Sequence, residues 1–315
     1  MSDQNNEIEP HIAVLVLDTP IPTITEKYGD FGDNTIDLLE KNSPDSSITP
    51  PYKLKKYQLK NDNNEELEIV YENLKKAIQL KLIHGFILTG SGCDAFGEYK
   101  WLIRFKSFLK NVLINLNKPI VGICFGHQLI ALILGCKIDR NNEGWELGIT
   151  TININDEIYK IKNSPFLELN QNIQIDNNMD SANILFEHLN LVEFHQDIIY
   201  GGIPQGFINF GSTSKCSIQG MISIPSPPPT QTTASTTAIT EENNELIKKP
   251  NYKILTFQGH PEFTTSYALD LLKYKFEKGL FNELTYEKAK YHTSSLNNQG
   301  DLIGKVICKF LYQED

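Results

Sequence analysis

Apolar residues follow two alternating patterns along the first 145 positions of the chain. Unbroken apolar runs are typical of strands buried in a parallel sheet, and there are three: HIAVLVLD (11–18), IHGFILTGSG (83–92) and KPIVGIC (118–124). A further strand is predicted at YKLKKYQLK (52–60), where apolar and basic residues alternate as on a strand with one solvated face. Apolar residues spaced three or four apart predict helices between these strands, at 23–41, 63–81 and 99–117.

Strands alternating with helices across short connectors predict an α/β fold, in which a mostly parallel sheet is covered by helices on both sides. In such sheets ligands bind beyond the carboxyl ends of the strands. The loops TGSG (89–92) and CFGH (124–127) both follow buried strands. We therefore expect these loops to lie near one another at the functional edge of the sheet.

The second half of the chain has a different pattern. Residues 145–222 lean towards β-structure, and we expect further strands there, some of them antiparallel. The Pro/Ser/Thr-rich and then acidic stretch at about 223–248 lacks the apolar area to offset chain ordering, which predicts a disordered insertion within a hairpin. YKILTFQGHPEF (252–263) is the expected return strand, and the tail is predicted to form two amphipathic helices. The prediction is thus one domain over 11–315, after a disordered N-terminus at 1–10.

Composition narrows the function classes. The formal charge is −10, from 29 basic and 39 acidic residues, which disfavours a nucleic-acid or anionic-membrane surface. No apolar run approaches the roughly 20 residues of a membrane span, and the polar N-terminus does not resemble a signal peptide. Five cysteines without paired spacing, in a chain with no evident export signal, indicate reduced thiols and a cytoplasmic location.

One cysteine stands where a strand runs straight into an apolar helix. Cys124 has Gly122 and Gly126 two residues away on either side, as the crowded turn of a nucleophile elbow requires. The positive end of the following helix would favour a thiolate, and the amide of Phe125 would face an oxyanion. The alternative is that the glycines only allow a helix to pack closely on a strand, since such short motifs recur by chance.

A second signal lies far along the chain. His260 and Glu262 follow the apolar strand YKILTF, so they too are expected at the carboxyl edge of the sheet. The imidazole could take the thiol proton while the carboxylate orients it through the other ring nitrogen. A lone histidine at a strand end is usually a satisfied surface residue, so only the pairing with a cysteine elbow makes this one a candidate base.

GICFGHQ (122–128) and HPE (260–262), in this order, resemble the two motifs of the class I, triad-type glutamine amidotransferases. The resemblance extends over about residues 11–270. KYGDFGD, LTGSGCDAF, GWELGIT and LTFQGHPEF are similar to a stand-alone subgroup that resembles the glutaminase domain of GMP synthase and includes plant γ-glutamyl peptidases and fungal amidotransferase-like proteins. It implies a three-layer, flavodoxin-like fold with an added β-rich segment. It also implies Cys124 as nucleophile, His260 as general base and acid, and Glu262 as its orienting partner.

The resemblance implies further site residues and no cofactor. Gln128 would contact the bound glutamine, and His195 falls where related chains carry a histidine near the amino-acid end of the substrate, although a structural role is an equal alternative. Many family members carry Gly-Gly-Pro in the oxyanion loop where this chain has Thr-Gly-Ser-Gly, so Gly90 is preferred to Ser91 as the second donor beside Phe125. Cysteines and histidines lack metal-ligand spacing, so no metal is predicted.

The predicted reaction is acyl transfer on the carboxamide of glutamine or on a γ-glutamyl amide such as glutathione, through a γ-glutamyl thioester. Because the chain has no G-x-x-x-x-G-K-[ST] phosphate loop, ammonia would pass to a separate subunit, or water would be the acceptor and the protein a hydrolase. A catalytically silent binding or regulatory module on the same fold is the alternative from another class. A redox-sensing thiol protein is disfavoured because Ile123, and not an acidic residue, precedes the cysteine.

Overall fold

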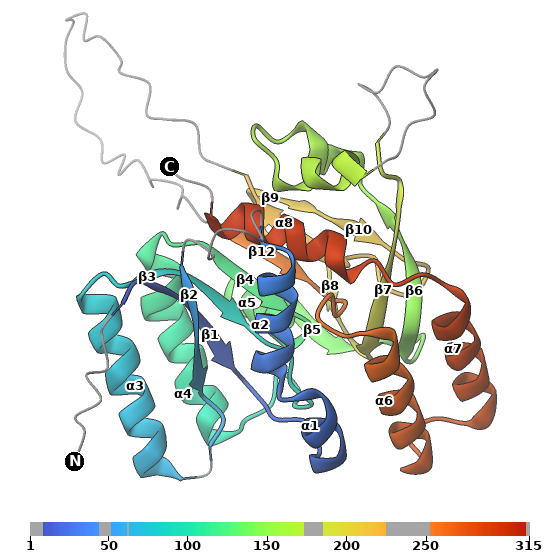
Figure 1. The fold of residues 1–315 in the computed structure, drawn as a ribbon, viewed down its shortest axis with the longest axis horizontal. Helices are drawn as coiled ribbons and strands as arrows, with labels where there is room; N and C mark the ends of the chain where they lie inside the picture. Colours follow the sequence, from blue (N-terminus) through green and yellow to red (C-terminus); the bar gives the residue numbers. More distant parts are fainter. Residues whose placement is uncertain (1–8, 44–51, 62, 173–184, 225–252, 313–315) are drawn as a thin grey trace, which may run out of the picture.

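A seven-stranded sheet forms the centre of the molecule in the computed structural model, which describes residues 9–43, 52–61, 63–172, 185–224 and 253–312 (Figure 1). Its strand order is β2-β1-β3-β4-β12-β11-β9. The first five of these are parallel, and β11 and β9 continue the sheet in antiparallel fashion. Their bounds are β1 His11–Val16, β2 Lys53–Gln58, β3 Ile83–Leu88, β4 Ile120–Ile123, β9 Phe207–Asn209, β11 Gly220–Ser223 and β12 Ile254–Phe257.

Helices cover both faces of this sheet, as the alternating pattern predicted. One face packs against α3 (Asn64–Gln79), α4 (Lys100–Phe108) and α5 (Phe125–Ile133), through alternate strand residues such as Leu15 and Leu88. The other face packs against α2 (Phe31–Lys41) and α8 (Gly300–Tyr312), through Val14 and Ile87. The α/β, three-layer, mostly parallel architecture predicted from the sequence is confirmed.

Two smaller sheets carry the added β-rich segment. One is antiparallel, in the order β10-β6-β7, with β6 Glu146–Ile154, β7 His188–His195 and β10 Gly211–Ser212. The other pairs β5 (Lys137–Arg140) with β8 (Asp197–Tyr200). The run 189–200, which reads as one apolar segment, therefore supplies strands to two different sheets, because the chain bends at Gln196.

Some predicted elements are divided or extended. The helix expected over 23–41 is two helices, α1 (Pro22–Tyr28) and α2, separated at Gly29, whose φ is +78°. The helix expected over 99–117 continues from α4 through one π turn (η1, Leu109–Leu113) and one 3-10 turn (η2, Ile114–Leu116). Two further 3-10 segments are η3 (Asp156–Lys160) and η4 (Pro165–Asn172).

The two amphipathic helices predicted in the tail are present as α6 (Thr265–Glu277) and α8, and a third helix that the pattern missed, α7 (Glu283–Ser295), lies between them. This helix has a mostly polar surface, so periodicity alone does not reveal it. It begins where the side chain of Asn282 accepts a hydrogen bond from the amide of Thr285 at 2.9 Å. It packs on β6 by placing Ala289 and Thr293 against Gly148, where a Cβ atom would clash with both. Figure 1 shows α6 and α7 side by side next to β6 and β7.

The expected hairpin is formed by β11 and β12, with Met221 opposite Thr256. Ser223, the first residue of the predicted insertion at about 223–248, is part of β11. The remainder of the insertion, 225–248, and residues 1–8 of the predicted N-terminal tail lie outside the described residues. No helix in the described part of the chain is long and apolar enough to cross a membrane.

Candidate active site

The candidate nucleophile lies at a strained turn between β4 and α5. Cys124 has φ +50° and ψ −100°, although only glycine adopts positive φ readily, and its side chain is 6% exposed. Its amide donates to the carbonyl of Phe257 on the neighbouring strand, and its carbonyl accepts from the amide of Gln128 one helical turn on. Hydrogen bonds on both sides of the residue therefore hold the turn in its unfavourable conformation.

Both flanking glycines are required by close approach of the backbone. A Cβ atom on Gly122 would lie 2.8 Å from the carbonyl of Gly126, and one on Gly126 would lie 2.5 Å from the carbonyl oxygen of Leu88. Real Cβ atoms do not approach backbone so closely. The glycines therefore allow the close helix–strand packing that the sequence offered as one interpretation, and this packing occurs at the same sharp turn that carries Cys124.

His260 and Glu262 follow the carboxyl end of β12. The Nδ1 atom of His260 lies 2.8 Å from Oε1 of Glu262, and the amide of His260 donates to the carbonyl of Val192 on β7. The ring stacks on Phe263 with 4.1 Å between centroids and 5° between planes. The imidazole is thus fixed from three directions, with its Nε2 side directed away from the carboxylate.

Cys124 and His260 come together across the sheet edge. Burial disfavours a charged imidazole, but the Cys124 sulfur and the Glu262 carboxylate outweigh it through charge and hydrogen bonding and raise the pKa of His260. Gly90 lies against both residues, since a Cβ atom there would be 3.0 Å from Cε1 of His260 and 3.9 Å from Cβ of Cys124. The Nε2 amide of Gln258 lies 3.6 Å from the Cys124 sulfur. This arrangement places an imidazole of raised pKa directly beside the Cys124 sulfur.

Two elements supply amides beside the sulfur. Phe125 is the first residue of α5, and amides in the first turn of a helix have no acceptor within the helix. The loop that contains Gly90 and Ser91 is held by Asp18, which accepts from Oγ of Ser91 at 3.1 Å and from the amide of Gly92 at 2.9 Å. Asp18 occupies the Gly92 amide, whereas Gly90 lies against Cys124 and His260, so the Gly90 amide remains a candidate for the second oxyanion donor.

Gln128 lies in the same pocket as Cys124, as the sequence predicted for a substrate-binding residue. Its Nε2 donates to the carbonyl of Asp197 at 3.0 Å and to Oε1 of Gln258 at 3.2 Å. Arg140 closes this side of the pocket, with ion pairs of 2.7 Å to both Asp197 and Asp94. The pocket has a volume of about 260 Å³. It is large enough for a small amino-acid derivative.

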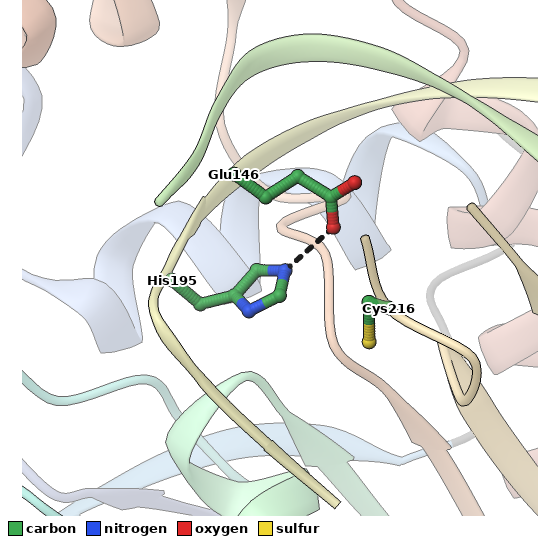
Figure 2. A group of neighbouring side chains, drawn as sticks. All are labelled: Glu146, His195 and Cys216. Carbon is green, nitrogen blue, oxygen red and sulfur yellow. Dashed lines mark hydrogen bonds and ion pairs between the residues drawn. The ribbon is translucent and has the colours of Figure 1, made fainter. Parts of the chain in front are cut away.

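His195 also lines the pocket but is tied into a buried network behind it. Its Nε2 lies 2.9 Å from Oε2 of Glu146, as Figure 2 shows, and its Nδ1 lies 3.2 Å from the carbonyl of Asp197. Burial disfavours a charged His195 imidazole, but hydrogen bonding and charge from Glu146 and Glu193 outweigh burial and raise the pKa of His195. Both ring nitrogens are engaged, which supports the structural alternative considered for this residue.

Cys216 lies beside this pair, so Glu146, His195 and Cys216 place three potential metal-ligating atoms within 4.8 Å of one another (Figure 2). Sequence spacing did not reveal this group, because its members come from β6, β7 and the loop before β11. Glu146 already accepts hydrogen bonds from Thr213 at 2.6 Å and from Gln219 at 2.8 Å, besides His195. The group is therefore satisfied as a hydrogen-bonded network, with the Cys216 sulfur directed at the carbonyl of Ile218 at 3.2 Å.

Glu193 connects this network with the candidate site. The side chain is fully buried, its Oε2 lies 3.4 Å from Nε2 of His195, and it is packed against Gly259, next to His260. Within the described residues, neither of its oxygens accepts a hydrogen bond. Burial raises the pKa of Glu193 to about 7, against the opposing effect of His195.

The sequence missed several of these residues for one reason. Asp18, Glu193 and Gln258 come from three different strands or strand ends and belong to no short motif that signals chemistry. Gln258 stands two residues before His260, and Asp18 ends the apolar run of β1, which are the only local signals that could have drawn attention to them.

The fold and this site define a class: an α/β protein with a cysteine at a strand–helix elbow and a histidine–glutamate pair beside it. The model of the class-I glutamine amidotransferase family matches residues 52–278. A glutamine amidotransferase-like protein of Schizosaccharomyces pombe is 28% identical over 305 residues, covering 96% of this chain and 99% of its own. Gamma-glutamyl peptidase 4 of Arabidopsis thaliana is 38% identical over 230 residues, covering 73% of each chain.

A solved glutamine amidotransferase of Thermotoga maritima shares the fold, with a TM-score of 0.55, 17% identity and coverage of 96% of this chain and 99% of its own. The chain belongs to the class-I glutamine amidotransferase family.

Proposed function

We propose that the protein is a hydrolase of γ-glutamyl amides that uses Cys124 as nucleophile, His260 as general acid and base, and Glu262 to orient His260. The observation that carries this proposal is the contact of the elbow cysteine with an imidazole whose other nitrogen lies 2.8 Å from a buried carboxylate, at the wall of a pocket. Similarity to a γ-glutamyl peptidase over 73% of the chain supports the substrate class.

The reaction follows from the roles of these groups. The thiolate of Cys124 attacks the γ-carbonyl carbon, forming a C–S bond, while the developing oxyanion accepts from the amides of Phe125 and Gly90. The C–N bond then breaks as the His260 imidazolium gives its proton to the leaving nitrogen. Water, losing a proton to His260, attacks the thioester, breaks the C–S bond and releases glutamate and the thiolate.

Glutamine amidotransferase activity, with ammonia passed to a separate subunit, is the second candidate. Family membership supports it directly, since the chemistry differs only in that ammonia is the leaving amine. The hydrolase is preferred because gamma-glutamyl peptidase 4 of Arabidopsis thaliana is 38% identical over 73% of this chain, and hydrolysis requires no ammonia acceptor.

The test is to incubate the protein and its Cys124→Ala variant with glutathione and with glutamine, and to measure glutamate, cysteinylglycine and ammonia. The proposal expects Cys124-dependent release of glutamate and cysteinylglycine from glutathione. Ammonia from glutamine with intact glutathione would establish the amidotransferase instead. No turnover of either compound would leave the silent module as the better account.

A further inference from the structure

The side of the pocket next to His260 is formed by one face of α6. His260 stacks on Phe263, and Phe263 stacks on Tyr267 with 4.0 Å between centroids. Tyr267, Leu271, Tyr274 and Lys275 all line the pocket, and their spacing of four, three and one residues places them on one face of the helix. The pocket therefore extends from the imidazole along α6.

This side must receive the leaving group. In the proposed reaction His260 gives a proton to the departing nitrogen, so that nitrogen and its substituents lie on the His260 side of the sulfur. The glutamyl half then lies on the opposite side, towards Gln128 and Asp197.

Lys275 is a cation without an acidic partner at this end of the pocket. In the described part of the chain no aspartate or glutamate forms an ion pair with it, whereas Arg140, on the other side, is bound to two aspartates. Its Nζ lies over the ring of Trp145, 5.5 Å from the centroid, and Trp145 also lines the pocket. Partial burial lowers the pKa of Lys275, and only the charge of Cys124 opposes this.

A half-buried ammonium that faces a pocket and has no acidic partner among the described residues is stabilised by an anion that a ligand supplies. A carboxylate suits it, because the group would replace the lost hydration and neutralise the charge. When the leaving group is an amino acid or a peptide, it carries such a carboxylate. When the substrate is free glutamine, the leaving group is ammonia and carries none.

The geometry points to Lys275, backed by Trp145, as a binding site for the carboxylate of the leaving group. This inference rests on the proposed function. It identifies the substrates as γ-glutamyl peptides or γ-glutamyl amino acids with a free carboxylate on the leaving side. The aromatic and aliphatic residues Phe263, Tyr267 and Leu271 lie between Lys275 and His260 on the same wall and would contact the leaving side chain.

The test compares glutathione with glutathione whose glycine is a carboxamide, which keeps the glutamyl half and removes only the leaving-side charge. Wild-type protein should cleave glutathione with a kcat/KM roughly 10- to 100-fold higher than the amide, the range expected for one charge-assisted interaction. Lys275→Met should lower kcat/KM for glutathione to the level of the amide and leave the amide unchanged. Lys275→Arg should retain much of the preference.

Lys273→Met is the matched control, since Lys273 lies on the same helix, is exposed and approaches Glu277 at 4.0 Å. It should leave both rates unchanged, and thermal unfolding of each variant reports folding. Equal rates on glutathione and its amide in the wild type overturn the inference while the hydrolase stands. An equal loss on both compounds in Lys275→Met also overturns it, because Lys275 would then bind the α-carboxylate of the glutamyl half. If the wild type cleaves neither compound, the proposed function fails and the inference falls with it.

Discussion

Cys124 combines backbone strain with a charged partner, and each has a physical role. A non-glycine residue in such a conformation costs about 1–3 kcal/mol, which the surrounding hydrogen bonds must offset. The strained turn places the buried side chain of Cys124 at the wall of the pocket, within reach of His260. The imidazole in turn depends on Glu262, whose Oε1 fixes the ring nitrogen that does not face the sulfur.

Replacing Glu262 by glutamine should therefore affect catalysis more than folding. The amide keeps the shape but stabilises the imidazolium less and can hold the wrong tautomer, so kcat for γ-glutamyl cleavage should fall by about 10²- to 10⁴-fold. Steady-state kinetics on glutathione would measure this, and thermal unfolding would show whether the fold persists. Activity within a factor of two of wild type would remove Glu262 from the proposed mechanism.

At this scale the sequence pointed to the residues of short motifs and, through the family resemblance, to His195, but not to Asp18, Glu193 or Gln258. Cys124, His260 and Glu262 are readable because strand ends and glycine spacing locate them. The position of Lys275 at the pocket could not be predicted from the sequence, because a lysine on an amphipathic helix usually faces solvent. The packing of α6 beside Trp145 directs this lysine towards the pocket.

At the scale of elements, the contact between β3, β4 and α5 determines the shape of the elbow. Gly126 lies in the first turn of α5, where alanine would ordinarily favour the helix by up to about 1 kcal/mol. The methyl group of an alanine at position 126 would lie 2.5 Å from the carbonyl oxygen of Leu88. This oxygen belongs to the backbone of the central sheet, so moving it would be costly. We expect the clash to exceed the gain in helix propensity.

Gly126→Ala should accordingly lower the free energy of unfolding by about 1–3 kcal/mol, as overpacking does in other cores. Urea denaturation measures the change. Gly92→Ala serves as the comparison, because a Cβ atom there would meet only Asp18 Oδ2 at an ordinary 3.6 Å. A Gly126→Ala protein as stable as the wild type would mean that β3 and α5 are less tightly packed than described.

Elements were predictable where periodicity was strong and uninterrupted. The parallel strands and α3 follow their patterns closely, whereas α7 was missed because its stability comes from a cap and a small-residue contact with β6. The division of 189–200 into β7 and β8 also lies beyond pattern reading, since both halves are apolar and only the pairing partners differ.

Over the whole molecule, the antiparallel sheet β10-β6-β7 lies behind the candidate active site. It brings Glu193 and His195 against the backbone that carries His260, and it could not be foreseen from the parallel half of the chain. The charges buried there make folding itself sensitive to pH. Glu193 matters most near neutrality, because burial raises its pKa to about 7.

The sign of this effect is fixed by where the proton is bound. Unfolded, Glu193 loses its proton near pH 4.3, whereas in the folded protein it keeps the proton up to about pH 7. Stability from this group is therefore present below about pH 4.3 and is lost as pH rises through 7. Glu193→Gln should flatten the decline in the free energy of unfolding between pH 4.5 and 7, measured by urea titrations across that range. An unchanged slope would show that His195 keeps Glu193 ionised throughout.

The hairpin of β11 and β12 places Ile224 and Lys253 at the end of the sheet opposite to the candidate active site. The chain leaves the described hairpin after Ile224 and re-enters it at Lys253, at the amino end of β12, while His260 follows the carboxyl end of the same strand. A fluorescent domain or a protease recognition sequence inserted between Ile224 and Lys253 would be joined to the amino end of β12. The Cys124 sulfur lies near the carboxyl end of the same strand. A reporter inserted between Ile224 and Lys253 would therefore be attached at the end of the sheet opposite to the candidate active site.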